Sequence, residues 1–363
     1  MKNKAIKSLG VLTIASLIST SALAQVTVSG YVEAGFLNGN SVGSRLLTSS
    51  QGFGGESVVT ITGKGNLTNG WTYMAYQSLD SDEAGNGRNT ANASPMTTRA
   101  IEISPNKDFK MFYTFDGVYG GEIARTAVPT VTERVGDMTG ASGISEFIDV
   151  TSGGHAFGFE VLNVGPNGRL SVAYNPNLDG NVQSSSDRIQ SGTLQTTEAN
   201  ASSGYSVGYS VNVAPVKIAL GYTKIDQMQA SNAQDATSKT LGITYTGGDF
   251  AIGAQRTKND GTKAALLQTA NIEDTVNTVA FSYAASKEIT IGGSYSTMER
   301  IGAAIVKGPD EKVYQAVVAY NLGPVVASIA YEDAKNAPAL GTNQATTSGV
   351  DAQTTKIKVK ANF

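Results

Sequence analysis

The stretch Tyr205-Ser206-Val207-Gly208-Tyr209-Ser210-Val211-Asn212-Val213 decides the fold, because apolar and polar side chains alternate along it without a break. Successive side chains of a β-strand point to opposite faces, so a period of two indicates a strand with one apolar and one polar face. The same alternation recurs between residues 239 and 246 and between residues 324 and 333. Helical spacing is nearly absent, and the sequence therefore predicts an all-β protein.

Working outward from this stretch, sixteen alternating segments can be assigned. They lie at 26–37, 56–65, 70–80, 97–104, 108–117, 154–163, 168–175, 204–213, 216–225, 239–246, 249–257, 275–285, 288–298, 312–322, 324–333 and 354–363. Short turns and long polar segments alternate between them, and the longest polar segment is 118–153. An even number of strands of about ten residues, with short turns at one end and long loops at the other, is typical of an outer-membrane β-barrel.

The first 24 residues have the features of an export signal. Lys2, Lys4 and Lys7 precede an apolar run, and Ala22-x-Ala24 fits a signal-peptidase site. The run is about ten residues long, whereas a membrane-spanning helix needs about twenty. We therefore expect a signal peptide over residues 1–24 and a single β-barrel domain over residues 25–363.

Composition excludes several classes of function. Among 363 residues there is no Cys and one His, which excludes a disulfide scaffold and a zinc ribbon. The net charge of −3 removes the broad basic surface that nucleic-acid binding requires. His155 is the single His, so no zinc or nucleophilic catalytic set can be assembled, and we expect neither an enzyme nor a cofactor. Asp80-x-Asp82-x-Ala84-Gly85 lacks the remaining ligands of a calcium loop.

Aromatic residues on the apolar face fall at the strand ends, where tyrosine and tryptophan mark the two boundaries between lipid and water. On the long-loop side these residues are Phe36, Phe115, Tyr174, Tyr205, Tyr222, Tyr295, Tyr314 and Tyr331. On the short-turn side they are Trp71, Phe109, Tyr245, Phe250, Tyr283, Tyr320 and Phe363. Val, Ile, Leu and Ala dominate the same face between the two rows, as a hydrocarbon band requires.

The two end strands carry a family resemblance. The opening strand Gln25-Val-Thr-Val-Ser-Gly-Tyr-Val-Glu-Ala-Gly-Phe36 and the closing strand Lys356-Ile-Lys-Val-Lys-Ala-Asn-Phe363 resemble those of Gram-negative general porins. The resemblance implies a sixteen-stranded barrel that forms a homotrimer in the outer membrane, among lipid and lipopolysaccharide. It also implies passive diffusion of small hydrophilic solutes and ions, and recognition of the terminal Phe363 by the outer-membrane assembly machinery.

In this family the third external loop folds into the lumen and presents carboxylates opposite a basic wall. The segment 118–153 is the third long connection, so the resemblance assigns its carboxylates to the constriction. They are Glu122, Glu133, Asp137, Glu146 and Asp149. The family's Pro-Glu-Phe-Gly-like turn is absent, and Glu146-Phe147 is only a partial echo of it, so the carboxylate at the narrowest point stays open.

Strand parity assigns the basic wall independently of the family. If Ile357, Val359 and Phe363 face lipid, then Lys356, Lys358 and Lys360 point into the lumen, because a lysine facing mid-bilayer costs about 2–4 kcal/mol. The same reasoning places Lys64, Lys110, Arg169 and Lys217 inside, together with Glu33, Asp116 and Glu160. Arg99 is grouped with the lumen-facing basic residues, although it shares a face with Ile101 and Ile103, which would instead place it at the external rim.

Two alternatives stay open at this point. A barrel of similar build with a specific substrate site would show rows of aromatic residues along the lumen, and the inward Tyr31 alone supports it weakly. A secreted all-β adhesin or surface module would also show alternating strands. The sequence does not distinguish cation from anion preference.

Overall fold

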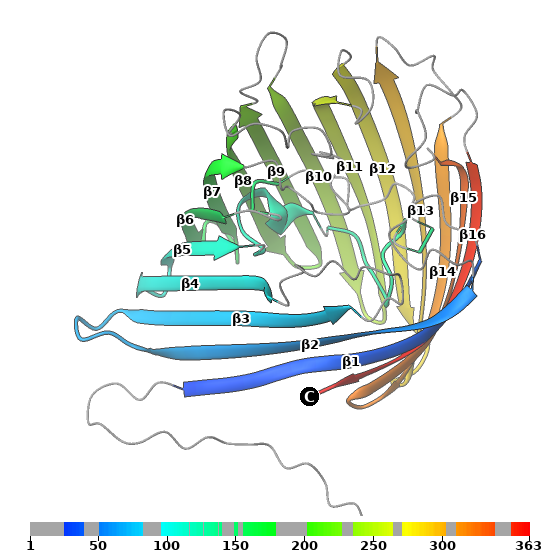
Figure 1. The fold of residues 1–363 in the computed structure, drawn as a ribbon, viewed down its shortest axis with the longest axis horizontal. Helices are drawn as coiled ribbons and strands as arrows, with labels where there is room; N and C mark the ends of the chain where they lie inside the picture. The colour runs from blue at the N-terminus through cyan, green and yellow to red at the C-terminus, as the bar shows by residue number, and fades with distance from the viewer. Residues whose placement is uncertain are drawn as a thin grey trace, which may run out of the picture.

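The protein is a closed barrel of sixteen antiparallel strands in a computed structural model (Figure 1). The structure describes residues 25–39, 51–82, 96–115, 117–125, 127–136, 138–139, 149–151, 155–178, 202–226, 235–263, 271–302, 310–337 and 350–363. The strands are β1 Gln25–Gly39, β2 Gln51–Asn66, β3 Thr72–Asp82, β4 Met96–Asn106, β5 Phe109–Phe115, β6 His155–Leu162, β7 Arg169–Leu178, β8 Ser202–Val213, β9 Val216–Asp226, β10 Ala236–Gly247, β11 Phe250–Lys263, β12 Asn271–Ala284, β13 Ile289–Gly302, β14 Glu311–Leu322, β15 Val325–Ala337 and β16 Val350–Asn362.

Each strand pairs with its neighbours in the sequence, and β16 pairs with β1 to close the sheet. At this seam Tyr31 lies opposite Asn362, and the Gly30 amide donates a hydrogen bond of 3.0 Å to the Phe363 carbonyl. The closed, even-stranded barrel and all sixteen predicted strands are confirmed. The C-terminal residue and the first strand lie together at the end of the barrel where the short turns are.

Several strands extend beyond the predicted bounds at their long-loop ends. The structure begins β2 at Gln51 and β16 at Val350, and it ends β11 at Lys263. The prediction followed the apolar alternation, which ends where the lipid ends. Backbone hydrogen bonds between neighbouring strands do not require apolar side chains, so the ladder continues past that boundary into polar sequence.

The two faces of the sheet differ as strand parity predicts. Large apolar side chains such as Val279, Ile329 and Ile357 point outward and are about half exposed. The inner face carries small and polar side chains, for example Ser171, Ser206 and Thr223. The apolar side chains therefore lie outside and the polar ones inside, the reverse of a soluble protein and the arrangement that lipid requires.

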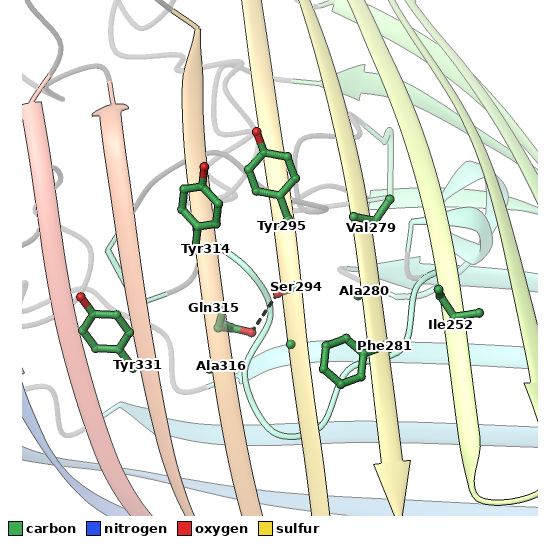
Figure 2. Close-up of a pocket in the computed structure, with 11 residues that line it drawn as sticks. Ile252, Val279, Ala280, Phe281, Ser294, Tyr295, Tyr314, Gln315, Ala316 and Tyr331 are labelled. Atoms are coloured by element: carbon green, nitrogen blue, oxygen red, sulfur yellow. Dashed lines mark hydrogen bonds between the residues drawn. The ribbon is translucent and has the colours of Figure 1, made fainter.

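The outer face of β11 to β15 shows the aromatic row at the long-loop side (Figure 2). Tyr295 and Tyr314 pack with ring centroids 4.8 Å apart, and Tyr331 lies beside them on β15. Gly293 and Ala316 leave a shallow apolar hollow of about 350 Å³ below these rings, bounded by Phe281. Among the described residues, no helix is long and apolar enough to cross a membrane.

The face assignment predicts the effect of a charge on β12. Val279 points outward and is 48% exposed, whereas Ser282 lies on the inner face. We expect Val279→Arg to lower the free energy of unfolding by about 2–4 kcal/mol in phospholipid bilayers, because the guanidinium would face hydrocarbon. The matched variant Ser282→Arg places the same charge in water and should cost less than half as much. Urea titrations of both variants measure this difference, and equal losses would contradict the assignment.

Candidate functional site

The connection from β5 to β6 enters the barrel, and we name its described residues, 117–125, 127–136, 138–139 and 149–151, the inner loop. Its first part forms a short 3-10 helix, η1 (Gly120–Ala124), against the inner face of β7, β8 and β9. The Gly120 amide donates to the Ser171 hydroxyl at 2.7 Å, and the Gly121 amide donates to Ser206 at 3.1 Å. Serine side chains on the wall thus satisfy backbone donors that the short helix leaves free.

The inner loop then follows the wall from β10 towards β16. The Ala127 amide donates to Gln255 on β11 at 3.2 Å, and the Ala127 carbonyl accepts from Thr244 on β10. Farther along, Gln315 on β14 donates to the Arg134 carbonyl at 2.8 Å. The last described part returns to β7, where Asn175 donates to the Val150 carbonyl at 3.0 Å.

Glycines on the inner face of the strands let the loop approach the wall closely. A Cβ at Gly242 would collide with the Ala127 side chain, and one at Gly292 would collide with Val131. A Cβ at Gly253 would lie 2.8 Å from Pro129, closer than real carbon atoms approach. A glycine inside a strand marks the close approach of another segment. These glycines define the path of the loop, and the sequence analysis did not use them.

Glu332 on β15 fixes the far part of the inner loop. Its side chain is fully buried, and its carboxylate accepts from the Gly136 amide at 2.9 Å and from the Thr139 amide at 2.8 Å. The Thr139 hydroxyl donates to it at 2.6 Å, and Gln315 donates at 2.9 Å. Four donors on one buried carboxylate form a strong anchor, because hydrogen bonds to charged groups contribute about 1.5–3 kcal/mol each.

A cluster of two lysines and two glutamates lies where the loop meets β16 and β1. Lys358 bonds Glu133 of the inner loop at 2.5 Å and Glu33 of β1 at 3.1 Å. Lys356 contacts the same two carboxylates at 3.4 and 3.5 Å. The resemblance implied carboxylates of this loop opposite a basic wall. Glu133 instead bonds directly to that wall, so the cluster is compensated in charge.

A second charged network lies beneath the start of the loop. Lys110 contacts Glu160 at 2.6 Å and Glu102 at 3.0 Å, and Arg169 donates to Glu160 at 2.6 Å. The Tyr119 hydroxyl donates to Glu102 at 2.6 Å. Burial and this hydrogen bond raise the pKa of Tyr119 well above its ordinary value, so the hydroxyl stays a donor. Glu102 did not figure in the sequence prediction, although strand parity places it on the inner face.

The other predicted carboxylates have separate environments. Glu122 pairs with Arg125 at 2.9 Å within the loop. Asp149 is fully buried, and it accepts from the Thr151 amide at 2.8 Å and from Ser206 at 3.2 Å. Asp149 therefore ties the loop end to β8 and does not face open water. The predicted residues Asp116, Asp137 and Glu146 lie outside the described residues.

Three predicted lysines lie on the inner face towards the short turns. Lys64 and Lys217 are exposed and lie within two residues of the short-turn ends of β2 and β9. Lys360 lies three residues from the C-terminus, with its ammonium 3.2 Å from the ring centre of Tyr31. Tyr31 also faces the lumen, where its hydroxyl donates to Glu56 at 2.6 Å.

The grouping of Arg99 with the lumen-facing residues is wrong. Arg99 lies 4.9 Å from the ring centre of Phe115, on the face that carries the exposed Ile101. Its partners in the ladder therefore place it at the outer rim, as its parity with Ile101 indicates.

His155 also lies on this outer face, where Tyr113 contacts its Nδ1 at 2.6 Å. Among the described residues, no group of three or more His, Asp or Glu side chains could hold a metal ion.

Comparison with known proteins identifies the family to which this barrel belongs. Residues 11–337 match the family described as Gram-negative porin. Among solved structures, OmpT of Vibrio cholerae, described as an outer membrane protein in trimer form, has a TM-score of 0.65 at 10% identity, over 94% of this chain and 99% of that chain. A porin refined at 1.8 Å resolution has a TM-score of 0.63 at 14% identity, over 93% of this chain and 100% of that one. A mutant of Rh. blastica porin has a TM-score of 0.59 at 12% identity, with 93% and 100% covered. The search of curated proteins finds no match.

The anchor at Glu332 predicts a loop that loosens when the charge is removed. Glu332→Gln would place amide hydrogens where the Gly136 and Thr139 amides now donate. We expect a loss of about 1.5–3 kcal/mol in the stability of the folded barrel and larger current fluctuations in single-channel recordings. The control is Asp333→Asn, because Asp333 is the next residue and instead contacts Lys335 at 3.1 Å. Unchanged noise and stability in Glu332→Gln would contradict the anchor.

The close approach of the inner loop to the wall glycines predicts that a larger side chain at such a glycine pushes the loop into the lumen. Gly242→Val should displace the Ala127 segment and lower the single-channel conductance, because the open cross-section shrinks. Gly63→Val is the matched control, since the nearest atom to its Cβ would be 4.0 Å away. Conductance in planar bilayers measures both variants. A conductance of Gly242→Val equal to that of the control would show that the loop does not touch this wall.

Proposed function

The chain belongs to the Gram-negative porin family and is an outer-membrane channel for small hydrophilic solutes and ions, and on this premise we propose that the inner loop sets its size limit and ion selectivity. The observation that carries the proposal is the fixation of the loop inside the barrel. Glu332, the serines of β7 and β8, and the lysine cluster of β16 hold it at separate places along the wall. A segment held at several points narrows the lumen permanently, so it can act as a filter.

Permeation through this constriction needs no chemical step. A barrel of sixteen strands is wide enough to keep an aqueous channel, so polar solutes pass down their gradients. The polar inner wall replaces part of their hydration. Charged side chains at a narrow opening with walls of low dielectric constant bias which ions pass. At the cluster of Lys356, Lys358, Glu33 and Glu133 the opposite charges balance, which supports weak selectivity at that level.

The biological setting of the channel also forms part of the proposal. We propose that residues 1–24 are removed on export and that the mature barrel assembles as a homotrimer, as the trimer form of the Vibrio cholerae relative suggests. Phe363, which pairs with Gly30 at the seam, would present the C-terminal strand to the assembly machinery. The exposed apolar face would contact lipid and lipopolysaccharide.

Opposite neutralisations at the lysine cluster test the selectivity. Lys356→Gln with Lys358→Gln leaves Glu33 and Glu133 uncompensated, so the zero-current potential under a KCl gradient should shift towards cations. Glu33→Gln with Glu133→Gln should shift it towards anions. Two unit charges about 10 Å from the ion path contribute about 0.8 kcal/mol in water, so we expect about a fourfold change in the permeability of each ion, in opposite directions for cations and anions.

The fourfold neutral variant is the internal control. It removes both signs together, so its zero-current potential should return close to that of the wild type. Shifts of the same sign in the two double variants, or no shift in either, would contradict a constriction at this cluster.

A further inference from the structure

Arg134 is an exposed charge on the lumen side of the inner loop. Its carbonyl accepts from Gln315 of β14 at 2.8 Å, which holds the backbone against the wall. Its two neighbours in the chain face that wall, because Glu133 bonds to Lys358 and Val135 is buried in an apolar cluster. The Arg134 side chain therefore points away from the wall and into the lumen, where it is exposed.

The carboxylates nearest to Arg134 have other partners. Within the described part of the chain, no carboxylate forms an ion pair with its guanidinium. Glu133 is held by the two lysines of β16, and Glu122 pairs with Arg125 at 2.9 Å. Glu332 lies behind the loop, where it is fully buried and accepts from four donors. A solute in the lumen therefore meets the guanidinium rather than these carboxylates.

The other charges beside the inner loop occur in balanced sets. The cluster of two lysines and two glutamates at β16 and β1 is neutral. Lys360 and Glu56 lie opposite Glu33 on the two sides of β1 and add one charge of each sign. The network beneath the start of the loop has two cations and two carboxylates. Among the described residues, Arg134 is thus the exposed charge on the inner loop that has no counterpart.

The remaining inner charges lie nearer the two ends of the barrel. Lys64 and Lys217 are exposed close to the short-turn ends of their strands. Towards the long loops, Asp274 and Glu311 are buried. The short turns carry charges of both signs, namely Lys107, Asp108, Asp249, Lys287 and Glu288. None of these residues belongs to the inner loop, so they act on an ion before or after it passes the loop.

We propose that Arg134 gives this channel a preference for anions at the inner loop, and that small carboxylates are the solutes it favours. The inference rests on the proposed function, because it requires ions to pass the inner loop. A guanidinium presents two parallel N–H donors that match the two oxygens of a carboxylate. Because the Arg134 side chain stays exposed to water, this pairing is weak enough for the solute to be released.

A single introduced thiol tests the charge of this position, because the chain has no Cys. In planar bilayers, Arg134→Cys should lower the permeability of chloride and raise that of potassium. Each change should be about twofold to fourfold, which is the effect of a unit charge about 5–10 Å from the ion path in water. A thiol reagent that carries a trimethylammonium group should restore the wild-type zero-current potential. A reagent that carries a sulfonate should shift it further towards potassium.

The matched control is the neighbouring wall residue. Val135 is 2% exposed, so neither reagent should reach the thiol of Val135→Cys, and its zero-current potential should stay at the wild-type value.

A conservative variant tests the preference for carboxylates separately. Arg134→Lys keeps the charge but loses the two parallel donors. Its ratio of potassium to chloride permeability should stay close to that of the wild type. Its ratio of acetate to chloride permeability should fall by about twofold, the scale of an exposed ion pair. Zero-current potentials between potassium chloride and potassium acetate measure this ratio, and an unchanged ratio would overturn the pairing with carboxylates.

The outcomes separate this inference from the proposed function. Wild-type potentials in Arg134→Cys, together with the expected shifts in the double variants of the lysine cluster, would overturn the role of Arg134 and leave the constriction intact. Shifts of the same sign with both thiol reagents would show that bulk rather than charge acts at this position, which would also overturn it. No shift in any of these variants, or a lumen without ion current, would instead contradict the proposed function itself.

Discussion

The structure depends on one constraint: every backbone N–H and C=O group within the hydrocarbon must find a partner inside the protein. An unsatisfied group there costs several kcal/mol, so a sheet in lipid cannot have a free edge. The seam between β1 and β16 meets this constraint, and the bond from Gly30 to Phe363 lies at its end. Once the sheet closes, alternation along each strand assigns one face to lipid and the other to water.

A water-filled interior creates a second requirement, which is to hold a peptide segment there without an apolar core. The inner loop solves it with polar anchors and close backbone contact. Glu332 and the serines of the wall bind its amides, and the glycines remove the side chains that would hold it away. No single anchor fixes the inner loop, because a loop held at one place could still move across the lumen.

The sequence predicts the barrel well because the alternation of apolar and polar residues is repeated in every strand. Alternation, loop lengths and aromatic rows all depend on local spacing, and one residue of error would move a whole strand to the wrong face. Arg99 shows the value of parity, since its neighbours Ile101 and Ile103 place it correctly outside. The loop contacts could not be predicted in this way. Glu133 and Lys358 are far apart in the sequence, and only the path of the loop brings them together. The one local signal for that path, glycine on the inner face of several strands, is readable in the sequence.

The pairing of charges beside the inner loop explains how one lumen can be both narrow and permeable. At the constriction, opposite charges bond to each other, so neither sign of ion meets a deep well in which it would be trapped. Conduction requires binding that is weak enough for release. On the inner face towards the short turns, an exposed charge such as Lys64 or Lys217 acts through water, where it attracts ions without holding them. Compensated charge beside the inner loop and exposed lysines nearer the short turns therefore let ions interact with the wall without obstructing their flow.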